Sequence, residues 1–371
     1  MNVPRLSSAH PLGSRRALAA IRLIVVVLAM LAGSLQAALA QTRVYTSHAG
    51  PPPRLYVIDA STNTVIAQAP TEQGNFGVVA APDGSRVYVA AQTPDWVSVI
   101  DTATNAVIGT IPVGATPTYL AISPDGSRVY SGNQGDQSVS VIDTASDTVI
   151  ATVPVSDIPG GLAVSPDDTR VYVTTWPSNG VDVIDAQTHT VVTHVTVGTL
   201  PDFVAFTPDG ARAYVANLGS NDLSVIDTRT NSVVATVPVD PSPAQLAFTP
   251  DGTRLYITHT FNSVSVLDSA THALVASIPL DRPWALGITP DGSRVYVGTA
   301  AGTVAVIDTG TNTIVATIGG VPFPNGLAIA TAGRVPTSKD DCKDGGYRRY
   351  GPPAGPFRNQ GQCVSYVEGR R

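Results

Sequence analysis

Two turn signatures that alternate at a period near forty residues predict an all-β fold for this chain, a seven-bladed β-propeller of four-stranded antiparallel blades. The first signature is a triplet of two apolar residues and an aspartate, which recurs at intervals of 40 to 42 residues. Its aspartates are Asp59, Asp101, Asp143, Asp185, Asp227, Asp268 and Asp308. The second signature is Pro-Asp-Gly, which begins at Pro82, Pro124, Pro166, Pro208, Pro250 and Pro290, with Asp168 in place of the glycine in the third copy. Each repeat therefore carries two turns.

The segments between the turns predict strands rather than helices. Each repeat holds four short runs rich in Val, Ile, Ala and Thr, for example residues 120–123, 128–131, 139–142 and 148–153. β-Branched residues dominate these runs, and no apolar stripe with a 3.6-residue period outlasts a single run. We call the four strands a, b, c and d, and four such strands at this period form one propeller blade.

The two ends of the repeat region predict that the blades close into a ring. Arg43 to Tyr45 enter the repeat at strand b, whereas Asn325 to Ile329 supply an additional strand a after the last complete repeat. Strand exchange between the chain ends would complete one blade and pair two strand edges that would otherwise be exposed. Seven blades follow from the count.

Two further columns of side chains favour structural roles. One tyrosine recurs in strand b of every blade, which is typical of a packing element: Tyr45, Tyr88, Tyr130, Tyr172, Tyr214, Tyr256 and Tyr296. An arginine at the start of strand b, such as Arg86, is expected to lie opposite the aspartate that ends strand c, such as Asp101. We therefore predict seven Arg–Asp pairs, which would help to set the strand register.

The repeats resemble those of a known family. The segments "SPDGSRVY", "VSVIDT" and "TVIATVPVG" are similar to the repeat of the YVTN-type bacterial β-propellers, the YncE-like family, over nearly all of residues 43–335. The resemblance implies a propeller fold and an extracytoplasmic, periplasmic or cell-surface protein. It implies little about function, because one fold serves many functions.

The chain divides into three parts by composition. Residues 1–40 read as a signal peptide with four arginines, an apolar segment and the cleavage site Ala38-Leu39-Ala40, which predicts export by the Sec or the twin-arginine route. Residues 41–336 form the predicted propeller, and residues 337–371 form a basic tail. The net charge of the whole chain is −6, and removal of the signal leaves −10, with about −13 on the propeller and about +3 on the tail. An acidic propeller without lysine disfavours nucleic-acid binding, and no later apolar segment is long enough to span a membrane.

The tail holds the two cysteines of the chain, Cys342 and Cys363. Export to an oxidising compartment favours a disulfide between them. The segment is similar to short cysteine-containing tails of assorted bacterial secreted proteins, although Tyr347 stands where those tails usually carry a tryptophan. Its basic charge could contact the acidic propeller or an anionic cell surface.

A specific site is expected where the blades differ, on the face that carries the b-to-c and d-to-a connections. Residues at the end of strand b, at the entrance of strand a and in the b-to-c loops form a mixed set of aromatic, amide, histidine and acidic side chains that suits a polar ligand, a peptide or a glycan. The candidate ligand-binding residues are His48, Asn133, Asn217, His259, Tyr119, Asp202, Phe203, Gln245, Trp284, Asn325 and Trp176.

The sequence lacks the motifs and ligand sets that are typical of catalysis or of cofactor binding. His48 and His259 belong to different blades and lack an evident third ligand, so we predict no metal site. No nucleophile elbow, haem-attachment motif or phosphate loop occurs, and we predict no cofactor and no catalytic residue. The sequence favours a monomeric, non-enzymatic binding scaffold outside the cytoplasm. The alternative is a lactonase-like or lyase-like propeller enzyme, or a companion subunit of a periplasmic dehydrogenase.

Overall fold

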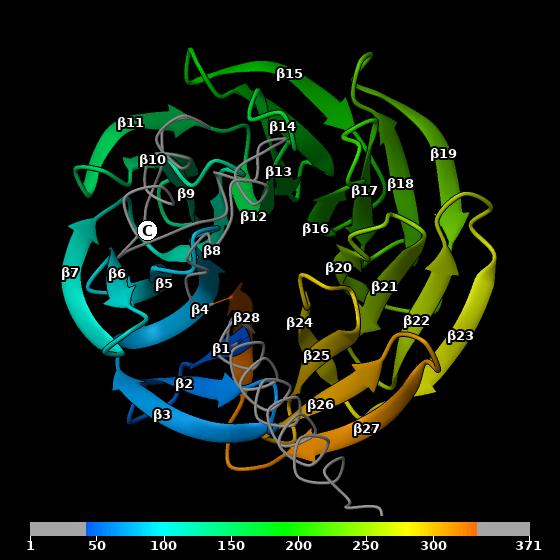
Figure 1. Ribbon diagram of the computed structural model, residues 1–371. Coiled ribbons are helices and arrows are strands. Elements are labelled where there is room, and N and C mark those ends of the chain that lie inside the picture. Colours follow the sequence, from blue (N-terminus) through cyan, green and yellow to red (C-terminus); the bar gives the residue numbers. More distant parts are fainter. Residues whose placement is uncertain (1–41, 332–371) are drawn as a thin grey trace, which may run out of the picture. The chain divides into compact units, whose positions relative to one another are not determined.

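The computed structural model describes residues 42–331, and these form seven four-stranded antiparallel sheets arranged as blades around a common axis (Figure 1). We call the centre of this ring the channel, and we call its end on the side of the b-to-c and d-to-a connections the channel mouth. Blade 1 consists of β28 (Pro324–Thr331), β1 (Thr42–His48), β2 (Arg54–Asp59) and β3 (Thr64–Pro70). Blade 2 consists of β4 (Gln73–Ala80), β5 (Arg86–Thr93), β6 (Trp96–Asp101) and β7 (Ala106–Pro112). Blade 3 consists of β8 (Pro117–Ile122), β9 (Arg128–Asn133), β10 (Ser138–Asp143) and β11 (Thr148–Pro154). Blade 4 consists of β12 (Ile158–Val164), β13 (Arg170–Trp176), β14 (Gly180–Asp185) and β15 (Thr190–Thr196).

The remaining blades repeat the same order from the channel outward. Blade 5 consists of β16 (Pro201–Phe206), β17 (Arg212–Asn217), β18 (Asp222–Asp227) and β19 (Ser232–Pro238). Blade 6 consists of β20 (Pro243–Phe248), β21 (Arg254–His259), β22 (Ser263–Asp268) and β23 (Leu274–Pro279). Blade 7 consists of β24 (Pro283–Ile288), β25 (Arg294–Thr299), β26 (Thr303–Asp308) and β27 (Thr313–Ile318). No helix of the described residues is long and apolar enough to cross a membrane.

The chain ends close the ring as the sequence predicted. β28 pairs antiparallel with β1, with Val44 opposite Ile329, Tyr45 opposite Ala328 and Thr46 opposite Leu327. The seven inner strands contact one another around the full circle. The strand that begins the repeat region therefore gains its missing neighbour from the other end of that region, and no blade is left with an open inner edge.

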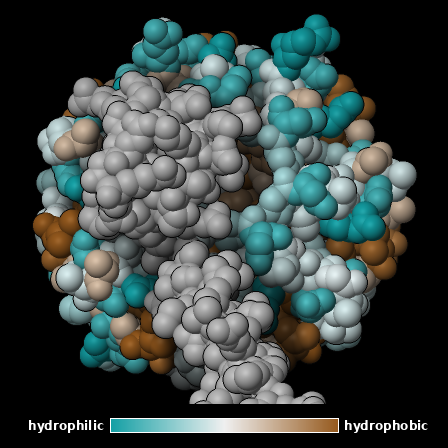
Figure 2. Space-filling model, viewed as in Figure 1, coloured by the Kyte–Doolittle hydropathy of each residue, from teal (hydrophilic) through white to brown (hydrophobic). Residues whose placement is uncertain are grey.

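The hydrophobic core lies between neighbouring blades. The interface of blades 1 and 2, for example, packs Tyr45 and Val57 against Val78 and Val89. Strands b and c are buried on both faces because they stand between two blades, whereas the outer strand d alternates between exposed and buried residues. Apolar side chains of the outer strands, such as Ile108, stay exposed, and the brown residues of Figure 2 lie mainly toward the rim.

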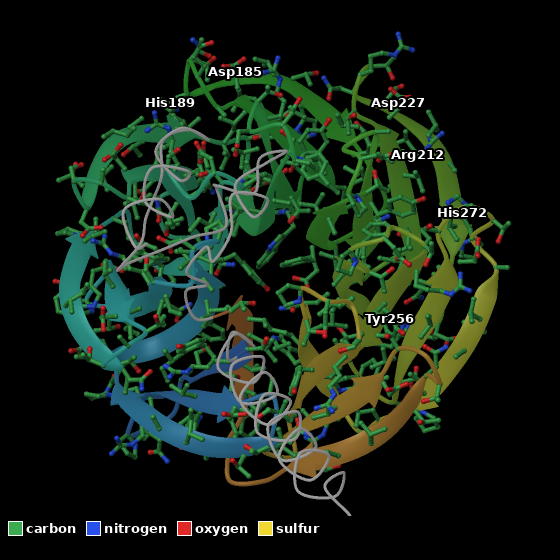
Figure 3. All side chains as sticks on the ribbon, in the orientation of Figure 1. Asp185, His189, Arg212, Asp227, Tyr256 and His272 are labelled. Atoms are coloured by element: carbon green, nitrogen blue, oxygen red, sulfur yellow. The ribbon has the colours of Figure 1, made fainter. Side chains whose placement is uncertain are left out.

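Four tyrosines of the column, Tyr172, Tyr214, Tyr256 and Tyr296, each form a hydrogen bond with the c-to-d turn of the next blade. Tyr256 donates a hydrogen bond to Asn312 Oδ1 (2.7 Å), and the hydroxyl of Tyr214 lies 2.8 Å from His272 Nε2. Asn312 and His272 occupy the same left-handed position of the turn between strands c and d, with φ of 54° and 60°. His272 therefore has a structural partner, and Figure 3 shows His189 and His272 toward the outer part of the ring.

The predicted register of the Arg–Asp pairs is confirmed, but the prediction that all seven pairs form ion pairs is wrong. All seven arginines stand opposite the aspartate of their own blade. Among the described residues, however, only three of these pairs approach within 4.0 Å, those of Arg128 (3.9 Å), Arg170 (2.6 Å) and Arg254 (2.8 Å). Arg86 instead forms an ion pair with Asp147 of the next blade at 3.0 Å.

The aspartate of this column primarily stabilises its own c-to-d turn. Asp143 Oδ1 accepts hydrogen bonds from the backbone N–H and the hydroxyl of Ser146, both at 2.9 Å. These bonds lower the pKa of Asp143, because they favour the charged carboxylate. An Asp that caps the following turn explains the aspartate column locally, without the arginine.

Candidate functional site

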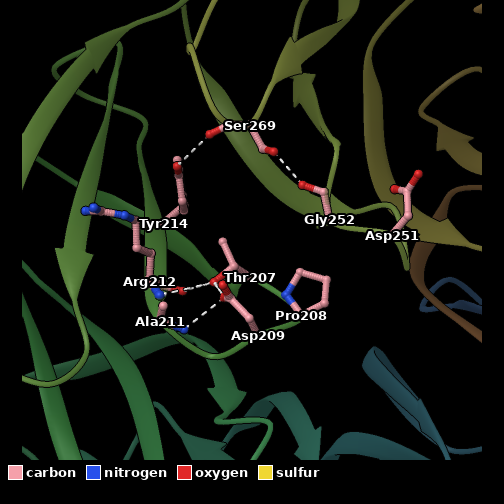
Figure 4. A pocket seen from close by; sticks show the side chains of 9 residues that line it. All are labelled: Thr207, Pro208, Asp209, Ala211, Arg212, Tyr214, Asp251, Gly252 and Ser269. Carbon is pink, nitrogen blue, oxygen red and sulfur yellow. Dashed lines mark hydrogen bonds between the residues drawn. The ribbon is translucent and has the colours of Figure 1, made fainter.

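The face that carries the Pro-Asp-Gly turns has polar grooves that repeat from blade to blade. Figure 4 shows one of them, of about 500 Å³, lined by Asp209, Arg212, Tyr214, Asp251 and Ser269 among others. Two similar grooves of about 500 and 540 Å³ are lined by the corresponding turns and arginines of blades 2 and 3 and of blades 6 and 7. A groove that recurs with the repeat is a consequence of blade packing, so these grooves do not single out a site.

The channel mouth on the opposite face is built from seven β-bulges. In every blade the pairing of strands a and b shifts register near the start of strand a, so that one or two residues of strand a leave the ladder. These residues are Phe76 and Gly77, Thr118, Gly160 and Gly161, Asp202, Ala244 and Gln245, Trp284 and Ala285, and Asn325 and Gly326. A bulge re-aims side chains and is frequent beside functional sites. The bulges thus coincide with the column where the repeats differ most.

A second backbone feature precedes the bulges. Five residues that come directly before the first proline of strand a adopt the left-handed region: Thr116 (φ 57°), Leu200 (50°), Ser242 (59°), Arg282 (44°) and Phe323 (38°). None of them is glycine, so each carries a conformational cost on the order of 1 kcal/mol or more. The five blades have the same backbone conformation at this position, but the side chain differs in each. This position therefore displays variable side chains on a common frame.

One pocket at this mouth does not repeat around the ring. It has a volume of about 420 Å³ and spans several blades. Its lining includes Phe261 from the b-to-c loop of blade 6, Trp284 of blade 7, Phe323 from the connection to blade 1, Asn325 of blade 1 and Phe76 of blade 2. Phe261, Phe323 and Trp284 are 65%, 55% and 37% exposed. Arg282, Thr260, Thr299 and Asn325 supply its polar groups. Large aromatic side chains are rarely left this exposed in a group, so the pocket is a distinctive apolar surface of this face. We call it the aromatic pocket.

The predicted residues Tyr119, Asp202 and Phe203 come together at the other side of the mouth. The Tyr119 hydroxyl donates to Asp202 Oδ1 at 3.2 Å, and the rings of Tyr119 and Phe203 meet edge to face with centroids 6.4 Å apart. The blades enclose the carboxyl group, although Asp202 keeps some solvent-accessible surface. Burial raises the pKa of Asp202 to about 6 because it penalises the charged form, while the Tyr119 hydrogen bond acts in the opposite direction.

Three other predicted residues lie inside the blades. Asn133 is fully buried, and its amide donates to Ser138 and Ser140. Asn217 is also fully buried and bonds to Asp222 and Ser224. His259 is 0% exposed, with Nδ1 at 3.2 Å from the Pro241 carbonyl oxygen, and burial lowers its pKa. These side chains support the loops of the mouth from within rather than lining its surface.

The last three predicted residues are at the mouth but in separate places. The ring of His48 folds back over Gly50 of its own b-to-c loop. Gln245 Oε1 accepts a hydrogen bond from the Leu286 N–H (3.0 Å) and so links the bulges of blades 6 and 7. Trp176 is half-buried at the end of β13 in blade 4, where it pairs with Ile158, and not in the b-to-c loop that the sequence suggested. Among the described residues, no three His, Cys, Asp or Glu side chains form a group that could hold a metal ion. Cys342 and Cys363 lie outside the described residues.

One polar cluster in blade 4 was not predicted from the sequence. Asp182 is 1% exposed and accepts hydrogen bonds from the Ser156 N–H (2.6 Å) and hydroxyl (3.0 Å), and His194 Nδ1 lies 2.7 Å from it. The other blades carry Ser or Ala at the position of Asp182, except for Tyr56 in blade 1, and this departure from the repeat was the available signal. The cluster is not a catalytic triad, because Ser156 and Asp182 both face Nδ1 of the imidazole and neither faces Nε2.

Comparisons with known proteins agree with this architecture. The family model described as "Lactonase, 7-bladed beta-propeller" matches residues 99–274. A search of curated proteins found no match. Among solved structures, hydrazine synthase of Kuenenia stuttgartiensis is similar with 24% identity and a TM-score of 0.63, over 69% of this chain and 89% of that chain.

Two further structures show the same fold. A functionally unknown protein of Desulfotomaculum acetoxidans has 18% identity and a TM-score of 0.71, over 78% of this chain and 99% of that chain. A candidate 6-phosphogluconolactonase of Bacteroides uniformis has 17% identity and a TM-score of 0.65, with the same coverage of 78% and 99%. These likenesses show the propeller fold. The narrower resemblance to the YncE-like family stays a prediction.

Proposed function

We propose that this protein is a non-enzymatic binding scaffold that works outside the cytoplasm and holds a protein or peptide partner on the face of the channel mouth. The observation that carries the proposal is the aromatic pocket, which is the feature of this face that breaks the repeat most clearly. The location outside the cytoplasm rests on the predicted signal peptide, which lies outside the described residues.

The chemistry of the aromatic pocket favours an apolar side chain of a partner. Its volume of about 420 Å³ lies in the range of ligand sites, and its walls are the rings of Phe76, Phe261, Trp284 and Phe323. Exposed Trp and Phe side chains in a pocket are typical anchors of protein interfaces. Three polar side chains and one arginine are few for a glycan, which needs hydrogen bonds to several hydroxyl groups. The excess of acidic over basic residues in 41–336 would attract a partner with basic residues around its apolar anchor.

A pull-down followed by an affinity measurement tests this proposal. The full exported protein is used as bait on an envelope extract, and the captured partner is purified and titrated with three proteins: wild type, Trp284→Ala and Phe261→Ala. We expect each variant to weaken binding by about tenfold or more, the usual effect of removing an aromatic anchor. Ile108→Ala is a matched control, because Ile108 is similarly exposed (53%) but lies on the outer strand β7.

Two outcomes of this experiment would count against the scaffold at this face. Equal affinity of wild type and both pocket variants would exclude the pocket as the anchor. A captured molecule that survives protease and is lost after glycosidase treatment would replace the protein partner by a glycan.

A propeller enzyme is the second candidate, and one observation favours it. The lactonase family model matches residues 99–274, and this segment contains Asp202, whose pKa of about 6 suits an acid or base near neutral pH. A panel of lactones would be assayed with a pH indicator, using wild type and Asp202→Asn. Hydrolysis by wild type that Asp202→Asn loses would support the enzyme. Rates equal to the buffer blank would contradict it.

A further inference from the structure

The channel mouth between blades 3 and 5 contains a carboxylate that no described cation neutralises. Within residues 42–331, the Tyr119 hydroxyl is the hydrogen-bond partner of the Asp202 carboxylate, and no arginine or histidine lies within 4.0 Å of the carboxylate oxygens. This part of the chain has no lysine. A carboxylate that is enclosed without a countercharge is unfavourable, so it either takes up a proton or holds a cation.

The surroundings of Asp202 are built by three consecutive blades. Tyr119 comes from β8 of blade 3 and Asp202 from β16 of blade 5, so the hydrogen bond between them passes blade 4 (Figure 1). Blade 4 carries Gly160 and Gly161 at this point. A Cβ atom on Gly161 would lie 2.5 Å from Phe203 Cδ2 and 2.8 Å from the Asp202 carbonyl oxygen. The two glycines thus let the strand of blade 4 approach closely enough for the three side chains to meet.

Aromatic rings stand beside this carboxylate. The Tyr119 and Phe203 planes make an angle of 64° with centroids 6.4 Å apart. An edge-to-face pair leaves the faces of one ring uncovered by its partner, and a ring face attracts cations. Asp202, Tyr119 and Phe203 each keep some solvent-accessible surface.

We propose that Asp202, Tyr119 and Phe203 form a binding site for a small organic ammonium ion, with the carboxylate as counter-ion and the rings as an aromatic wall. An organic cation fits this set better than a hydrated metal ion, which requires several oxygen or nitrogen ligands. The site lies apart from the aromatic pocket and shares no residue with it. It therefore goes beyond the proposed function, and either can fail without the other.

The electrostatics of Asp202 add a property that can be measured. Its pKa of about 6 means that the carboxyl group is mostly protonated at pH 5 and ionised at pH 7.5. An ammonium ion is attracted by the ionised form. The affinity for an ammonium ion should therefore be about tenfold lower at pH 5 than at pH 7.5, in proportion to the ionised fraction of Asp202. The nearest titratable neighbour is Tyr119, whose pKa burial raises well above 10, so it does not change charge in this range.

Isothermal titration of the purified full chain at constant ionic strength tests the site. The probes are choline, butylammonium and 3,3-dimethylbutan-1-ol, which is a neutral analogue of choline. We expect at least one ammonium probe to bind and the neutral alcohol to bind at least about tenfold more weakly. Asp202→Asn keeps the size of the side chain and an acceptor for Tyr119, and it should reduce ammonium affinity at least tenfold and remove the pH dependence. Phe203→Leu should weaken choline binding without removing the pH dependence.

Asp157→Asn is the matched control, because Asp157 is an acid in the d-to-a connection of the same face, and within residues 42–331 its carboxylate accepts a hydrogen bond only from the Ile158 N–H. It should leave ammonium binding unchanged. The proposal is overturned if neither ammonium probe binds, if the neutral alcohol binds equally well, or if Asp202→Asn binds as tightly as wild type. Circular dichroism of each variant confirms that it is folded, and Phe203→Leu remains an independent test if one variant is not.

Discussion

Replacing Asp202 by asparagine should stabilise the protein at neutral pH, and the gain should disappear in acid. The pKa of this carboxyl group is about 6 in the folded protein, against an ordinary value of 3.8. Between these values the folded state binds the proton more tightly than the unfolded state, so the stability that depends on this group falls as pH rises from about 4 to about 6. A difference of about two pKa units corresponds to ~3 kcal/mol in the free energy of unfolding. Wild type has lost this contribution above pH 6.

Asparagine lacks the charge and can still accept the hydrogen bond from Tyr119. Asp202→Asn should therefore unfold with a free energy up to ~3 kcal/mol above that of wild type at about pH 7.5, and equal to it near pH 4. Equilibrium unfolding in urea at a series of pH values measures this difference, in which the contributions of all other groups cancel.

The control variant, Asp227→Asn, should show the opposite dependence of stability on pH. Hydrogen bonds from the Thr230 N–H lower the pKa of Asp227, so its stabilisation is present at neutral pH and is lost as pH falls. Asp227→Asn should be less stable than wild type at neutral pH, with a gap that closes in acid. A variant Asp202→Asn that is less stable than wild type at pH 7.5, or whose advantage does not shrink toward pH 4, would refute the reasoning about burial.

Three further predictions concern packing and processing. A double-mutant cycle with Tyr256→Phe and Asn312→Ala should give a coupling of about 1 kcal/mol in the free energy of unfolding, because their hydrogen bond joins two blades; additive effects would contradict this. Gly161→Ala should cost roughly 1–3 kcal/mol, since its Cβ would meet Phe203, whereas Gly109→Ala in an open position should be nearly neutral; equal urea midpoints would contradict this. Amino-terminal sequencing of the exported protein should begin at Gln41, and a retained residue 1–40 segment would exclude the predicted signal peptide.

Much of the fold could be predicted from local rules. The Pro-Asp-Gly turns, the aspartate that caps the c-to-d turn and the β-branched runs between them act over a few residues, so they can be recognised in the sequence. The period sets the number of blades, and the offset between the first and the last strand predicts the closure that pairs Val44 with Ile329. The bulged column at the mouth was also visible, as the place where the repeats stop resembling one another.

The contacts within the site depend on tertiary structure. Tyr119 and Asp202 are 83 positions apart, and their hydrogen bond exists because two glycines of blade 4 allow the neighbouring blades to approach. The contacts of the arginines also depend on tertiary structure. Register places Arg86 opposite Asp101, but a long side chain can reach the next blade, and there it meets Asp147. The blades, their number and the variable column at the start of strand a follow from repeated short-range chemistry, so they can be recognised in the sequence. Which of those side chains meet, and which acid becomes enclosed, was decided only when seven blades packed around one channel.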